Sequence, residues 1–138
     1  MINVIYNNEA IKFLSKDDIS KLKQLSDTSK LKRSRINLHK NYQSKIQDMV
    51  ICFKKDSYVE PHFFQNKNTV FKIITGSIQI RIFNSNRNFI KKIILNKQNF
   101  FLYINKKTIY DVKGIAKYSL VHEFMEGPFR KNFFKCFK

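Results

Sequence analysis

The sequence of 138 residues has no tryptophan, three glycines, two prolines and two cysteines. With so little glycine and proline, and with 43% hydrophobic and 14% aromatic residues, the chain is neither collagen-like nor a disordered basic tail. No apolar run approaches the ~18 residues of a membrane span, so we expect no transmembrane segment. The amino-terminal residues show no basic start followed by an apolar block, so no secretory signal is expected. The length predicts one domain.

The two cysteines, Cys52 and Cys136, lie far apart and not at a metal-binding spacing. We expect Cys52 to be a small buried apolar residue, and a reducing cytoplasm is the default compartment for such a chain. The sequence also lacks a glycine-rich phosphate loop and a Ser-His-Asp order. These absences exclude the most familiar nucleotide-binding and hydrolytic motifs.

Negative charge is scarce, since 27 Lys and Arg stand against 10 Asp and Glu, which gives a net charge of +17. Lysine supplies 22 of the cations and arginine 5. This mixture, rich also in Asn, Ile and Phe, is what an AT-rich genome imposes on many proteins. A selected anion-binding surface is the alternative interpretation. Nucleic acid ranks last among the partners because the chain has no recognition helix and no RNP-like motif.

The pattern of apolar residues predicts one helix followed by many strands. Ser15 and Asp18 form a capping-box pattern, and apolar residues at helical spacing follow within residues 15–30. The alternation of Ile78, Ile80 and Ile82 with polar residues predicts a half-buried strand. Further short segments rich in β-branched and aromatic residues cover 47–54, 57–63, 69–75, 89–95, 100–104, 108–112 and 117–124. Strands at this spacing are typical of an antiparallel sandwich or barrel.

Four segments resemble the small WbuC-type cupin-fold metalloproteins, which are encoded among bacterial O-antigen and other surface-polysaccharide genes. These segments are LKRSRINLHK, SYVEPH, GSIQIRIF and HEFMEGPF, in unbroken order between about Lys30 and Phe137. The resemblance implies an all-β, single-domain cupin, that is, a double-stranded β-helix or jelly-roll barrel, with a short N-terminal helix. We place its boundaries at 1–31 for the helical segment, 32–129 for the barrel and 130–138 for a basic-aromatic tail.

The resemblance also implies a metal site of three histidines and one glutamate, and this sequence departs from it. His62 matches the first ligand, but the other positions fall on Phe64, Thr69 and Tyr110. One histidine cannot hold a catalytic metal. We therefore interpret the chain as a degenerate member without a metal cofactor. An alternative site built from His39, His62 and Glu123 stays open, beside the simpler reading that the three histidines are unrelated.

Several residues are candidates for binding a ligand. Arg33 and Arg35 alternate on an expected strand, so both guanidinium groups face one side, where they suit a phosphate or carboxylate. A solvated basic edge strand is the alternative. Four aromatic residues are expected either to line the barrel, where they could stack on a base or sugar ring, or to form ordinary core. They are Tyr58, Phe64, Tyr103 and Tyr110. The candidate binding residues are Arg33, Arg35, His39, Tyr58, His62, Phe64, Tyr110 and Glu123.

Two functions from different classes are consistent with the sequence. The first is a metal-free binding module for a nucleotide sugar or sugar phosphate in surface-polysaccharide biosynthesis. The second is a metal-independent sugar isomerase or epimerase that uses His62 as base and Tyr110 as acid, which requires both side chains to face one cavity. A purely structural role, pairing with itself or with an intact cupin, is a further alternative. The resemblance implies a homodimer.

Overall fold

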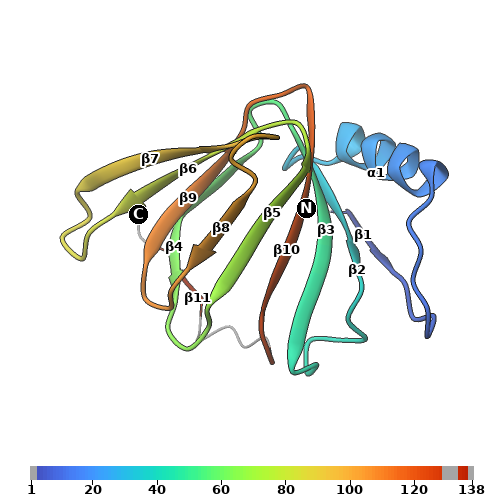
Figure 1. Cartoon of the computed structure of the whole chain (residues 1–138), viewed down its shortest axis with the longest axis horizontal. Coiled ribbons are helices and arrows are strands. Elements are labelled where there is room, and N and C mark those ends of the chain that lie inside the picture. Colours follow the sequence, from blue (N-terminus) through green and yellow to red (C-terminus); the bar gives the residue numbers. More distant parts are fainter. Residues whose placement is uncertain (1–2, 129–133, 137–138) are drawn as a thin grey trace.

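The computed structural model describes residues 3–128 and 134–136, which form two β-sheets and one helix (Figure 1). The first sheet has six strands in the order β1-β2-β3-β10-β5-β8, and the second has five in the order β11-β4-β9-β6-β7. The first sheet consists of β1 (Asn3–Tyr6), β2 (Arg33–Asn37), β3 (Ile46–Lys54), β10 (Tyr118–Glu126), β5 (Thr69–Thr75) and β8 (Phe101–Ile104). The second consists of β11 (Phe134–Cys136), β4 (Tyr58–Phe64), β9 (Ile109–Gly114), β6 (Ile78–Phe83) and β7 (Phe89–Leu95).

The two sheets pack face to face around one apolar core. Alternate residues of each strand point into this space, as the period of two along a strand requires. The core side chains come from both sheets and include Phe53, Phe71, Ile78, Ile80, Leu95, Tyr110, Val112 and Val121. This arrangement confirms the expected all-β fold with a short N-terminal helix.

The helix α1 (Lys16–Thr28) begins as the sequence predicts. The Ser15 side chain accepts a hydrogen bond from the Asp18 backbone, and the Asp18 carboxylate accepts one from the Ser15 backbone at 2.8 Å. Leu22 is fully buried and packs in a second apolar cluster with Ile36 and Cys52. The helix therefore covers the outer face of β2 and β3, on the side away from the main core (Figure 1).

The carboxy-terminal tail lies partly outside the described residues, which leave out 129–133 and 137–138. Within the described part, β11 pairs antiparallel with β4. Across residues 3–128 and 134–136, no helix has the length and apolar character needed to cross a bilayer.

Candidate functional site

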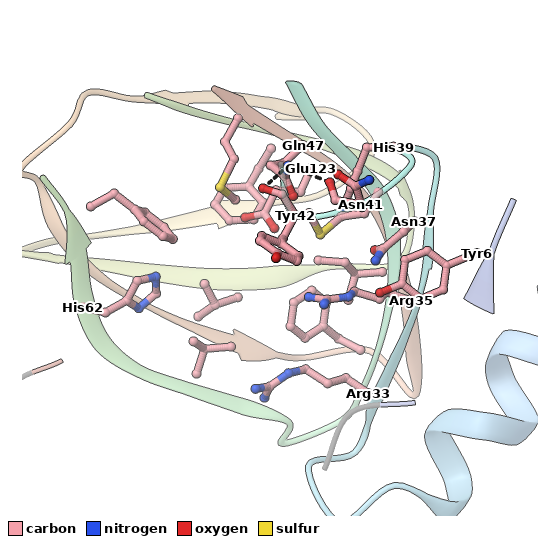
Figure 2. Close-up of a pocket in the computed structure, with 18 of the residues that line it drawn as sticks. Tyr6, Arg33, Arg35, Asn37, His39, Asn41, Tyr42, Gln47, His62 and Glu123 are labelled. Carbon is pink, nitrogen blue, oxygen red and sulfur yellow. Dashed lines mark hydrogen bonds between the residues drawn. The ribbon is translucent and has the colours of Figure 1, made fainter. Parts of the chain in front are cut away.

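A cavity of about 680 Å³ opens between the two sheets, and strand β2 forms one of its walls (Figure 2). Arg33, Arg35 and Asn37 all line it, while the intervening Ser34 and Ile36 are buried on the other side. The Ser34 hydroxyl donates to the Leu22 carbonyl of α1 at 2.6 Å. The alternation of the strand thus sends every second residue into the cavity and the others toward the helix.

The polar groups of this wall are incompletely satisfied. The Arg35 Nε and the Asn37 Oδ1 are buried and have no hydrogen-bond partner among the described residues. Arg33 Nη1 donates to the Tyr58 carbonyl at 3.2 Å, which links β2 to β4. The pKa of Arg33 is lowered, mainly by burial and to a smaller extent by the neighbouring charge of Arg35. Because buried polar groups are almost always paired, the Arg35 Nε and the Asn37 Oδ1 are available to hydrogen-bond a ligand or water in the cavity.

His62 lies on the opposite side of the cavity, on β4, and it forms an aromatic cluster with its neighbours (Figure 2). Its ring centroid is 4.4 Å from that of Tyr110 on β9 and 5.6 Å from that of Phe64. The His62 Nδ1 lies 2.8 Å from the Glu60 carbonyl, which can only accept, so Nδ1 carries a proton. In the neutral ring Nε2 is then the basic nitrogen.

The environment moves the pKa values of these two rings in opposite directions. Burial lowers the pKa of His62, so the imidazole is neutral at neutral pH. Burial and the charge of Glu123 raise the pKa of Tyr110 well above its usual value near 10, so the phenol keeps its proton. The cavity therefore holds a neutral base next to a protonated acid.

Glu123 supplies the carboxyl group of the cavity from β10. Its side chain is 8% exposed, and its strand neighbours are Met49 on β3 and Phe71 on β5. Burial raises the pKa of Glu123 to about 7, although the charges of Arg35 and Arg33 act to lower it. Near neutral pH this carboxyl group exchanges between a neutral donor and a charged acceptor.

The other two histidines of the chain, His39 and His122, differ in their position relative to the cavity. His122 follows the strand alternation away from the cavity, and its Nε2 lies 2.6 Å from the Asp48 carboxylate. His39 lines the cavity, and its Nδ1 lies 2.9 Å from both the backbone nitrogen and the carbonyl oxygen of Asp48. Burial lowers the pKa of His39, which makes it a neutral polar group at the edge of the cavity.

Seven of the eight residues expected to bind a ligand line this cavity, and Tyr58 is the exception. Its hydroxyl donates to the Asp111 carboxylate at 2.8 Å on the outer face of the second sheet. The reason is a β-bulge between Val59 and His62, which shifts the alternation by one residue so that Val59 points inward instead. Tyr103 also lies outside the cavity and is 53% exposed.

The residues at the implied metal positions do not fit a metal ion. His62 and Phe64 do face the same way, as expected, but a phenyl ring has no donor atom, and Thr69 and Tyr110 replace the other ligands. His39, His62 and Glu123 line one cavity. Yet no group of three His, Cys, Asp or Glu side chains in the described part of the chain is placed to hold a metal ion.

Several residues of the cavity were not expected from the sequence. Asn37 continues the alternation that begins at Arg33 and Arg35, so that pattern could have revealed it. Gln47 fixes the loop beyond β2, because its Nε2 donates to three carbonyl oxygens at 2.9–3.3 Å. Nothing in the local sequence indicated the other lining residues, which are Tyr6, Asn8, Lys40, Asn41, Tyr42, Met49, Ile51, Phe53, Val59, Phe71, Val112 and Met125.

Solved structures with the same architecture are cupin-fold proteins. The capsular polysaccharide assembling protein CapF from Staphylococcus aureus matches with a TM-score of 0.63 and 16% identity over 75% of this chain and 31% of CapF. KdgF from Halomonas sp. matches with a TM-score of 0.58 and 13% identity over 72% of this chain and 82% of KdgF. Oxalate decarboxylase from Bacillus subtilis matches with a TM-score of 0.57 and 12% identity over 68% of this chain and 24% of the decarboxylase. The chain has the cupin fold, and it spans less than a third of CapF.

Sequence comparison gives the family directly. No curated protein matches the chain. Residues 14–95, which include α1, β2 and the strands β3 to β7, match one family model. Because this match covers more than half of the chain, the protein belongs to the family described as Domain of unknown function (DUF6016).

Proposed function

We propose that the chain is a WbuC-like cupin that has lost its metal and binds a nucleotide sugar or sugar phosphate inside the barrel. The observation that supports this most strongly is the wall of β2, where the Arg35 Nε and the Asn37 Oδ1 are buried, unpaired and turned to the cavity. An arginine fork suits a phosphate or carboxylate, and the aromatic and apolar residues on the other sides suit a sugar ring or a base.

The biological setting proposed is the biosynthesis of surface polysaccharides. The motifs from SYVEPH to EGPF support this, because they resemble a family encoded among such genes. The fold shared with a capsular polysaccharide assembling protein agrees with it. The positive charge of the cavity wall fits the phosphate groups of activated sugars.

Calorimetric titration of the full chain against a panel of nucleotide sugars and sugar phosphates tests the binding function. We expect Arg35→Gln to weaken binding by about 10–100-fold, because it removes charge-assisted hydrogen bonds worth about 1.5–3 kcal/mol. Arg87→Gln, an identical change in the turn between β6 and β7, is the matched control and should bind as the unchanged chain does. Absence of binding to every ligand at millimolar concentration contradicts the proposal.

A second candidate function is metal-independent isomerisation or epimerisation of a sugar. The observation that favours it is the pair of His62 and Tyr110, whose ring centroids lie 4.4 Å apart in the same cavity with oppositely shifted pKa values. A neutral imidazole that accepts a proton and a phenol that donates one are the two groups that such a reaction needs.

Solvent deuterium exchange separates the enzyme from the binding module. Proton NMR of a bound nucleotide sugar that carries a ketone, in D₂O, should show loss of the C–H signal next to the carbonyl with the unchanged chain, because the carbonyl makes that proton acidic enough for His62 to remove. Tyr110→Phe and His62→Gln should each abolish this loss while binding is retained. If the unchanged chain incorporates no deuterium at a saturating ligand concentration, the catalytic candidate is rejected and the binding module stands.

The domain boundaries and the homodimer remain proposals. We propose that residues 32–129 act as the barrel unit, to whose sheet edges β1 and β11 add, and that two copies associate as cupins commonly do. The outer face of β8 supports association, because Phe101 and Tyr103 are more than half exposed there. Light scattering on the purified chain should give twice the mass of 16.6 kDa. A monomer at micromolar concentration contradicts this.

A further inference from the structure

The charges that face the cavity are unbalanced. Arg33, Arg35 and the exposed Lys40 line it, and Glu123 is the one acidic side chain among the described lining residues. No acidic group in the described part of the chain lies within ion-pair distance of either guanidinium group. The wall at β2 therefore carries two positive charges that the described residues do not neutralise.

The strand register explains why Glu123 does not neutralise them. Asn37 on β2 stands opposite Met49 on β3, and Met49 stands opposite Glu123 on β10. Two strand spacings, or about 10 Å between Cα atoms, therefore separate Glu123 from the β2 wall. Figure 2 shows the Glu123 side chain apart from Arg33 and Arg35, and all three line the same cavity. A ligand lying across Met49 would contact both sides.

We propose that the ligand carries two negative charges at the end held by Arg33 and Arg35, and that it crosses Met49 to accept a hydrogen bond from the protonated carboxyl group of Glu123. This inference rests on the proposed binding function and names the class of ligand. A phosphate monoester or a pyrophosphate diester has two negative charges at neutral pH, whereas a uronate has one. A dianion neutralises both guanidinium groups, and a monoanion leaves one without a counter-charge.

The groups around Glu123 support its role as a donor. Burial raises its pKa to about 7, and the cations that lower it are Arg35, Arg33, Lys67 and His122. Tyr110, whose phenol stays protonated, also faces it. A dianion bound between the arginines and Glu123 offsets the effect of the two guanidinium groups and disfavours a second negative charge nearby. Binding is therefore accompanied by uptake of a proton.

The charge requirement is tested by calorimetric titration of the full chain at pH 7.5 with glucose 1-phosphate and with glucuronate. Both are hexoses with one anionic group, and they differ in whether that group has two charges or one. We expect glucose 1-phosphate to bind at least about tenfold more tightly, since a charge-assisted contact contributes about 1.5 kcal/mol or more. Equal affinity overturns the inference.

The role of Glu123 is tested by counting protons with UDP-glucose, whose pyrophosphate diester does not titrate near neutral pH. Titrations in buffers of different ionisation enthalpy should give an uptake of about 0.8 proton at pH 7.5, the fraction expected to be ionised when the pKa is about 7. Glu123→Gln, whose amide still donates, should bind UDP-glucose at least as tightly with no uptake. Glu60→Gln, at an exposed position on β4, should behave as the unchanged chain does.

The outcomes distinguish this inference from the proposed function. Binding of UDP-glucose without proton uptake overturns the inference and leaves the binding function standing. Sulfate, a dianion that does not titrate in this range, serves as a probe without a sugar. The chain could bind sulfate with proton uptake, lose this uptake in Glu123→Gln, and yet bind no phosphorylated sugar. That result supports the inference and contradicts the proposed function. Absence of heat with all of these ligands overturns both.

Discussion

The ion pair between Arg81 and Asp111 allows a quantitative test of how the second sheet holds the cavity wall. Asp111 lies on β9, faces away from the cavity and is nevertheless 0% exposed, because the Arg81 side chain covers it. Arg81 Nη2 pairs with its Oδ2, Arg81 Nε donates to the same oxygen at 2.8 Å, and the Tyr58 hydroxyl donates to it at 2.8 Å. Tyr110 directly precedes Asp111 on β9, so this pair anchors the strand that carries Tyr110.

The expected magnitudes follow from the exposure of each partner. Removing one partner of a fully buried pair costs about 3–5 kcal/mol. Arg81 is 38% exposed, so water can reach the carboxylate when Arg81 is replaced, and we expect about 2–3 kcal/mol for Arg81→Met. Asp111→Asn leaves a guanidinium group that can turn to solvent, so we expect the free energy of unfolding to fall by about 1–2 kcal/mol. The double variant should lose about 1.5 kcal/mol less than the sum.

The assay is urea unfolding followed by far-ultraviolet circular dichroism, since the chain has no tryptophan to report by fluorescence. The Lys113 and Asp56 pair, 3.7 Å apart with both side chains about half exposed, provides the control cycle. Its coupling should stay below about 0.5 kcal/mol, as surface ion pairs do. If Arg81 and Asp111 couple no more strongly than this control pair, the argument that burial sets the strength of the pair is refuted.

Three further predictions concern other parts of the molecule. Leu22→Ala should lower the free energy of unfolding by about 2–5 kcal/mol, measured by urea unfolding, because it leaves a cavity under α1; no loss would contradict the packing. Gly76→Ala should lower the free energy of unfolding by about 1–3 kcal/mol or more, since φ is +84° and a Cβ would lie 2.6 Å from the Tyr118 carbonyl oxygen. An unchanged melting temperature would refute this. The free energy of unfolding should fall by about 2–3 kcal/mol as pH rises from about 4.5 to 7, because the pKa of Glu123 is about 7 in the fold and near 4.5 in the unfolded chain, so ionisation opposes folding. Glu123→Gln should flatten this part of the pH profile, and an identical profile would contradict it.

Local patterns predicted much of the fold because they depend on neighbouring residues. The capping box at Ser15 and Asp18 fixes the start of α1, and the helix ends at Thr28, two residues short of the predicted end. The segments 69–75 and 89–95 are strands with the predicted bounds, and the other predicted strands differ by a few residues. Strand β1 was missed because its four residues are held by parallel pairing with β2, a contact between distant parts of the chain.

The candidate site was predictable where alternation is regular and not where it breaks. Arg33 and Arg35 point the same way on β2, as the period of two requires. On β4 the bulge between Val59 and His62 reverses the parity, and Tyr58 therefore points outward. Pro61 lies within this segment, and proline in a strand is typical of bulges, so a sign of the irregularity was present in the sequence.

The two-sided character of β2 has a consequence for folding fidelity. A slip of one residue against β3 would turn both guanidinium groups toward the apolar underside of α1 and would turn Ile36 toward the cavity. Such a misaligned state would bury two charges without counter-ions. The free-energy cost of that burial is far larger than the stabilisation from the ladder hydrogen bonds that the state would keep. The arginines that form the cavity wall thus also exclude wrong registers of this strand, so replacing them with apolar residues would remove a safeguard against misfolding.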